Sequence, residues 1–134
     1  MQYNYDFEIA SLLIMTIILL HFVFVRQFPG EKTRVFGWLL FVCEAECLMN
    51  ILSCVGLANA AFVPQRLNEV LAFAFFVLEG ASSYLIYRYF MAACALRGRE
   101  RTVFAAVGMI PFAVFLVLVA VTPVTGFFYY FRDG

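Results

Sequence analysis

The stretch VFGWLLFVCEAECLMNILSCVGLA, residues 35–58, decides the fold. A helix that crosses a bilayer needs about 20 predominantly apolar residues, and this stretch is long enough. Its interior nevertheless carries Glu44, Glu46 and Asn50. A charged side chain at the bilayer centre costs about 2.5–3.5 kcal/mol on insertion scales, so such residues usually face other helices, pair, or serve a function. The stretch therefore predicts a membrane helix with at least one partner helix.

Three further segments have the same length and apolar character, at residues 7–25, 66–96 and 102–121. We therefore expect an all-α fold, a polytopic transmembrane helix bundle of four spans. Residues 1–134 contain no internal repeat or soluble segment, so they form a single transmembrane module, which we expect to be part of a longer membrane region.

Proline and glycine mark the predicted limits of these helices. Pro29 and Gly30 close the first span, and Pro64 stands near the start of the third. In the fourth span Pro111 removes a backbone hydrogen bond and can kink the helix. Pro123 and the nearby glycine at position 126 are expected to end it.

The overall composition supports the membrane assignment. Of the 134 residues, 65% are apolar and 13% are charged, whereas soluble domains have about 45–50% and about 25%. The net charge is zero and the arginines are dispersed, which excludes a basic stripe for nucleic acid. The four cysteines lie within or beside the spans rather than in exposed loops, so no disulfide framework is expected. The N-terminus MQYNYDFEIA lacks a basic region, so we expect the first span to be retained.

Basic residues predict the orientation, because cytoplasmic loops retain Lys and Arg. The first and third connections carry most of them, so both termini are predicted to lie outside a cytoplasmic (inner) membrane that the chain crosses several times. Tyr3, Tyr5 and the aromatic run at 127–131 suit the interfacial belts. The basic residues are Arg26, Lys32, Arg34, Arg97, Arg99 and Arg101 on the predicted inner side, and Arg66 and Arg132 on the other.

Small and polar side chains gather on one face of the second span and one face of the third, at about 100° per residue. One interpretation is a packing seam, because small residues allow close approach and amides bond across helices. The other is a ligand or proton site formed by Glu46, Asn50, Glu79 and Ser83. The two faces comprise Cys43, Glu46, Cys47, Asn50, Ser53 and Cys54 on the second span, and Asn68, Ala72, Glu79 and Ser83 on the third.

Glu44 and Arg88 point away from these faces. On antiparallel spans they lie at comparable depth, which predicts a structural ion pair between them. The alternative is that Arg88, two to three turns from the cytoplasmic end, extends to the headgroups and pairs with nothing.

Motifs for catalysis and metal binding are absent from the sequence. Cys43 and Cys47 stand four residues apart near Glu46, but there is no CxxC pair and His21 is the only histidine. We therefore predict no metal and no cofactor. No GxSxG, Walker A, HExxH or dinucleotide-binding loop occurs, so we predict no catalytic residue and no enzyme.

Five segments carry a resemblance to a known group of proteins: MQYNYDFEI (1–9), FVRQFPGEKTRVFG (24–37), ILSCVGLANA (51–60), LNEVLAFAFFVLEG (67–80) and TPVTGFFYYF (122–131). Together they resemble the N-terminal membrane region of certain Firmicutes signalling proteins. In those proteins a multi-helix module precedes a cytoplasmic GGDEF-type diguanylate cyclase or a related output domain. The resemblance implies a sensory or anchoring module, although no output segment follows within these residues. With four spans, such a domain would require an odd number of further spans.

These observations support a leading functional hypothesis and two alternatives. The leading one is a sensor or anchor in which ligand or lipid state changes the packing of the second and third spans. A small proton-coupled transporter using Glu46 or Glu79 is the second, although the biased basic loops and Arg88 count against it. The third is a non-catalytic membrane scaffold subunit. Expected partners are membrane lipids, a second copy in a homodimer and a cytoplasmic output domain in a longer form, but not nucleic acid.

Overall fold

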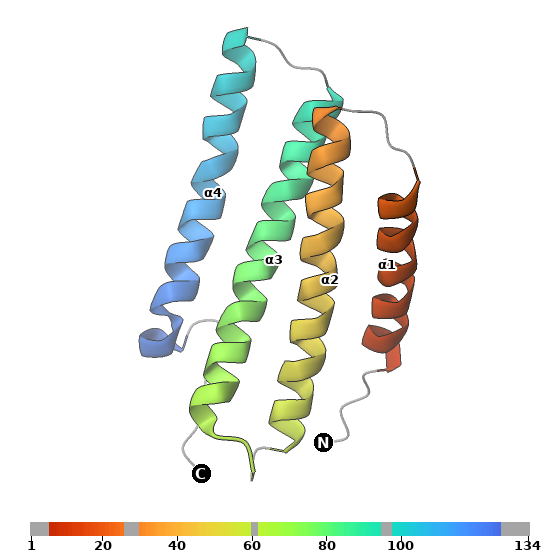
Figure 1. The fold of residues 1–134 in the computed structure, drawn as a ribbon. Helices are drawn as coiled ribbons and strands as arrows, with labels where there is room; N and C mark the ends of the chain where they lie inside the picture. Colours follow the sequence, from red (N-terminus) through yellow and green to blue (C-terminus); the bar gives the residue numbers. More distant parts are fainter. Residues whose placement is uncertain (1–5, 26–29, 60–61, 95–97, 127–134) are drawn as a thin grey trace.

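A computed structural model shows four helices within the residues that it describes (Figure 1). It describes residues 6–25, 30–59, 62–94 and 98–126. The helices are α1 (Asp6–Phe24), α2 (Glu31–Ala58), α3 (Gln65–Ala93) and α4 (Gly98–Thr125). Each is long and apolar enough to cross a membrane, which confirms the all-α fold with four spans.

The residues outside the described ranges include several that carried predictions. These are Tyr3, Tyr5, Arg26, Pro29, Arg97, the run 127–131 and Arg132. The orientation of the chain in the membrane stays a prediction.

Four helix limits differ from those expected. α3 ends at Ala93 rather than at about residue 96, and α4 begins at Gly98 rather than at about residue 102. The other two are the start of α2 and the end of α4. α2 begins four residues early, at Glu31, where a carboxylate in the first turn complements the helix dipole. α4 continues past Pro123 to Thr125, so the expectation that Pro123 ends it is wrong. The hydroxyls of Thr122 and Thr125 bond to backbone carbonyls one turn back, at 2.7 and 3.1 Å, and such bonds help a membrane helix to tolerate proline. Gly126, with φ +66°, then provides the left-handed residue that terminates the helix.

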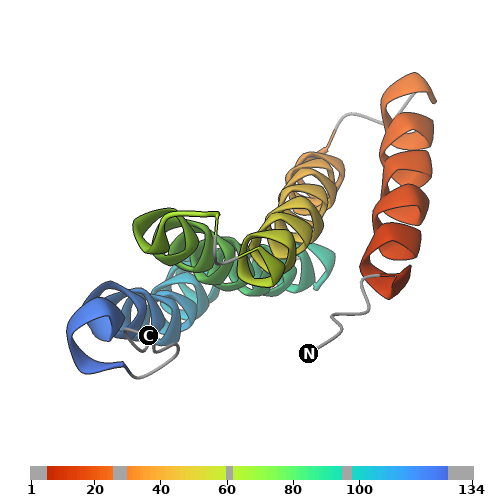
Figure 2. The same ribbon diagram turned by 90° about the horizontal axis from the view of Figure 1, so that it is seen from below.

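The four helices form an open row in chain order. Within the described residues, α1 packs on α2, α2 on α3 and α3 on α4, and the side chains of Glu31 of α2 and Arg101 of α4 also meet at one end. Figure 2 shows this row from below. Few side chains are consequently buried, and the buried apolar ones are Val35, Leu40 and Val119. Most of the apolar surface is left for lipid or for other protein.

Every helix interface contains a glycine that accommodates a side chain of the neighbouring helix. A Cβ at Gly80 of α3 would lie 2.8 Å from the ring of Phe115 of α4, and one at Gly37 would lie 2.8 Å from the ring of Phe22. Small residues are favoured between membrane helices because they allow this close approach. The four contacts are Gly37 with Phe22, Gly56 with Asn68, Gly80 with Phe115, and Gly108 with Tyr87.

Candidate functional site

Three carboxylates occupy the middle of the helices. Glu79 is the fifteenth of the 29 residues of α3, and Glu44 and Glu46 are the fourteenth and sixteenth of the 28 residues of α2. At a rise of about 1.5 Å per residue, each lies within about 3 Å of the midpoint of its helix. When the helices span a bilayer, all three acids therefore lie near its midplane, where charge is most costly.

Glu46 faces α3. Its half-buried carboxyl group lies within interaction range of the Ser82 hydroxyl and of the Glu79 carboxylate. Ser82 is buried, and its hydroxyl donates a hydrogen bond of 2.9 Å to the backbone carbonyl of Glu79. A serine hydroxyl has one proton to donate. Ser82 therefore stands between two acceptors and can serve only one of them at a time.

Glu79 and Ser83 face the other side of α3, toward α4. They line a cleft of about 420 Å³ whose other walls include four aromatic side chains, those of Tyr84, Tyr87, Phe112 and Phe115. Tyr84 stacks on Phe112 there, with ring centroids 5.0 Å apart, and the Tyr87 hydroxyl donates to the Phe104 carbonyl at 2.5 Å. Within the described residues, the Glu79 carboxylate has no hydrogen-bond or ion-pair partner. An unpaired acid beside aromatic rings suits a cation.

Asn50, the fourth residue of the predicted site, faces α1 instead. Its side-chain amide points to the carboxylate of Glu8 at a long 3.5 Å, and the Cys54 thiol lies 3.9 Å from the Asn50 oxygen. The second oxygen of Glu8 is buried without a partner among the described residues. Sequence reasoning missed Glu8, although an acid near the start of an otherwise apolar helix was a usable signal. The predicted site is thus divided between three helix interfaces.

The predicted Glu44–Arg88 ion pair is not formed, and this expectation is corrected. Glu44 accepts a hydrogen bond from Thr16 of α1. Arg88 lies 3.6 Å from the carboxylate of Glu31 and 3.4 Å from the Tyr84 hydroxyl. The physical reason is the early start of α2, which places Glu31 at the level of Arg88. Arg88 is only 35% exposed and is paired, so it does not extend alone to the headgroups either.

Glu31 joins three helices, because its carboxylate also pairs with Arg101 of α4.

We expect Glu31→Gln to lower the free energy of unfolding by about 0.5–1 kcal/mol at low salt, and by less at high salt, because half-exposed ion pairs are weak and screened. Reversible unfolding in mixed micelles at two salt concentrations measures this. Glu100→Gln removes a nearby exposed acid that has no ion pair among the described residues. An equal loss in both variants would contradict a specific role for Glu31.

Comparison with protein-family models, curated proteins and solved structures yields no match. The cysteines at positions 43, 47, 54 and 94 are free thiols. In the part of the chain that the structure describes, no group of three or more His, Cys, Asp or Glu side chains is arranged to hold a metal ion. The basis for assigning a function to this four-span helical membrane protein is therefore the geometry of its carboxylates.

Proposed function

We propose that the chain is a non-catalytic sensory or anchoring module of a bacterial signalling protein in the cytoplasmic membrane. A stimulus would be transmitted by repacking of α2 against α3. The observation that carries this proposal is the buried Ser82 hydroxyl, which bonds to the Glu79 backbone carbonyl and lies within range of the Glu46 carboxyl group.

The charge of Glu46 selects one of two arrangements of this proton. An ionised carboxylate only accepts hydrogen bonds, so it draws the Ser82 proton away from the Glu79 carbonyl. A protonated Glu46 donates to the Ser82 oxygen and leaves the Ser82 proton on that carbonyl. The ionised state also places two negative charges, Glu46 and Glu79, within range of each other. Proton or cation binding at Glu46 therefore favours one packing of α2 on α3 over the other.

The open row of helices supports transmission of this change. Among the described residues, the backbone of α1 packs only on α2 and that of α4 only on α3, and the Arg101–Glu31 ion pair links α4 to α2 at one end alone. A shift at the α2–α3 interface consequently moves the α1–α2 pair relative to the α3–α4 pair. The sequence resemblance supplies the rest of the proposal: a longer natural chain, further spans and a cytoplasmic output domain of the GGDEF type, working as a homodimer.

The distance between α2 and α3 tests the proposal directly. Spin labels on cysteines introduced at the exposed Leu57 and Leu67, with the native cysteines replaced, report this distance in lipid vesicles. We expect two populations whose label-to-label distances differ by about 1–2 Å and whose proportions change with pH. Glu46→Gln, which keeps a neutral hydrogen-bond donor, should show only the population favoured at low pH.

Glu100→Gln is the matched control for this measurement, because it removes an exposed acid at the start of α4. It should leave both populations and their pH dependence unchanged. A single distance that does not depend on pH would contradict the sensory mechanism, as would an identical response of the two glutamine variants.

The cleft beside Glu79 favours a second candidate, a small proton-coupled transporter of aromatic cations. An unpaired carboxylate at mid-helix, facing aromatic rings, would bind such a cation or a proton. Proton-driven uptake of ethidium into reconstituted vesicles tests this. Uptake that is lost in Glu79→Gln or Glu46→Gln, but kept in the Glu69→Gln control, would replace the sensory proposal. Equal uptake in empty vesicles would exclude the transporter.

A further inference from the structure

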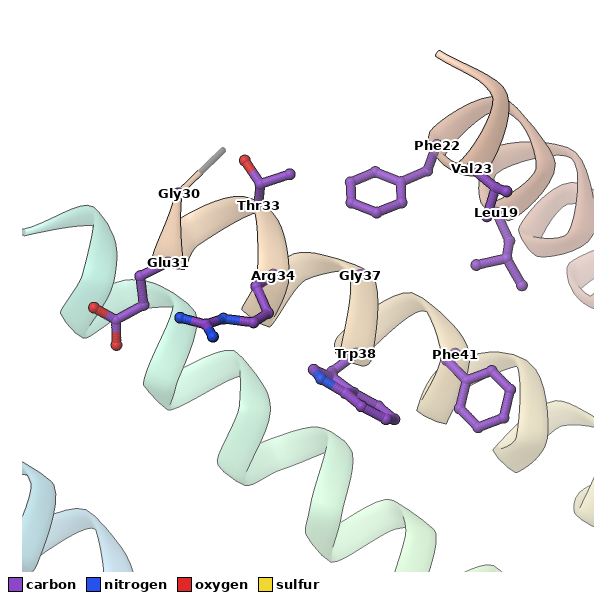
Figure 3. A pocket seen from close by; sticks show the side chains of 10 residues that line it. All are labelled: Leu19, Phe22, Val23, Gly30, Glu31, Thr33, Arg34, Gly37, Trp38 and Phe41. Carbon is purple, nitrogen blue, oxygen red and sulfur yellow. The ribbon is translucent and has the colours of Figure 1, made fainter. Parts of the chain in front are cut away.

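A second and larger cleft lies between α1 and α2, next to the start of α2. It has a volume of about 890 Å³. Leu19, Phe22 and Val23 line it from α1, and Arg34, Trp38 and Phe41 line it from α2. Figure 3 shows Leu19 and Phe22 extending from α1 toward α2. Its apolar walls and charged end are those of a site for an amphiphilic molecule.

The α2 wall changes from charged to apolar along the helix. Arg34, Trp38 and Phe41 are spaced i, i+4, i+7 and so share one face. α2 has 28 residues and is about 42 Å long, whereas the hydrocarbon core is about 30 Å thick. The first turn therefore reaches the headgroup level. Arg34 lies there, Trp38 lies at the interface that tryptophan prefers, and Phe41 lies among acyl chains.

The charge at this end favours an anion. Arg34 is exposed, and its guanidinium has no ion-pair partner among the described residues. The carboxylate at this end, Glu31, is already paired with Arg88 and Arg101. The exposed Lys32 adds a second positive charge on the same turn. A phosphate here would meet unpaired positive charge and no unpaired acid from the described residues.

We propose that this cleft binds one anionic phospholipid, with its phosphate at Arg34 and an acyl chain along Trp38 and Phe41. The site lies between α1 and α2 and does not involve Glu46, so it goes beyond the proposed function and stands or falls separately from it. The lipid would fill the gap between the two helices on this side and couple their packing to membrane composition.

Trp38 makes the proposal measurable, because it is the only tryptophan in the chain. Its fluorescence is recorded in vesicles that contain brominated phosphatidylglycerol or brominated phosphatidylcholine, since bromine quenches tryptophan on contact. We expect the binding constant for phosphatidylglycerol to be about fivefold higher than that for phosphatidylcholine. This ratio corresponds to the attraction of about 1 kcal/mol between one basic residue and an anionic membrane. Arg34→Gln should abolish this preference, and Arg34→Lys should retain it.

Arg99→Gln is the matched control, because it removes one exposed positive charge at the same end of the molecule but outside the cleft. It should keep the preference. Equal quenching by the two lipids in the unaltered chain would overturn the proposal, as would an equal loss in Arg34→Gln and Arg99→Gln. Absence of quenching by either lipid would also overturn it, because a protein chain would then cover Trp38.

Discussion

Gly108→Leu is expected to loosen α4 from α3 and to lower the free energy of unfolding by about 1–3 kcal/mol, the cost typical of overpacking. Even a Cβ at Gly108 would lie 2.5 Å from Cδ1 of Tyr87 and nearer still to the adjacent ring atom. The ring cannot swing away without loss, because the Tyr87 hydroxyl donates to the carbonyl of Phe104. The helices must therefore separate.

Reversible unfolding in mixed micelles, followed by circular dichroism, measures this change. Ala106→Leu is the matched control, since it adds similar bulk to an exposed position on the same helix. It should change the free energy of unfolding by less than about 0.5 kcal/mol. Combining Gly108→Leu with Tyr87→Ala should recover part of the loss, because the clash is removed. Similar losses for both leucine variants would mean that α4 does not pack on α3 as described.

The positions of the helices could be predicted because a spanning segment needs an uninterrupted apolar length, and four such lengths occur. Their ends were less predictable. The apolar pattern of α2 begins at Val35, but the helical backbone hydrogen bonds begin earlier. The Arg34 amide donates to the Gly30 carbonyl at 3.1 Å, and this bond belongs to the first turn of the helix. That turn contains Glu31, the carboxylate that pairs with Arg88 in place of Glu44.

The candidate site shows a second limit of periodicity. Glu46 and Asn50 lie one turn apart on a common face, as predicted, yet Glu46 contacts α3 and Asn50 contacts α1. One face of α2 can touch two neighbouring helices. The angular position of a residue around α2 does not by itself show which neighbouring helix that residue contacts. Glu8 was missed for the same reason, since its partner lies 42 positions along the chain.

Glu46→Met is expected to raise the free energy of unfolding by about 1–3 kcal/mol and to remove the pH dependence of the α2–α3 distance. Burying a charged group in the membrane interior costs about 2.5–3.5 kcal/mol on insertion scales. A hydrogen bond made by that group stabilises the folded state by about 0.5–1.5 kcal/mol, which offsets only part of the cost. Methionine fills a similar volume without that cost. Ser82 is left satisfied, because its hydroxyl already donates to the carbonyl of Glu79.

The same mixed-micelle unfolding measures the gain in stability, and spin labels at Leu57 and Leu67 measure the loss of response. Glu69→Met is the matched control, because the Glu69 carboxylate lies near the start of α3 and accepts an exposed hydrogen bond from Gln65. It should change neither quantity appreciably. A fall in stability on Glu46→Met would show that the carboxyl group holds α2 and α3 together, which would make it structural. A rise in stability with loss of response is the pattern of a residue that is kept for function at the expense of stability.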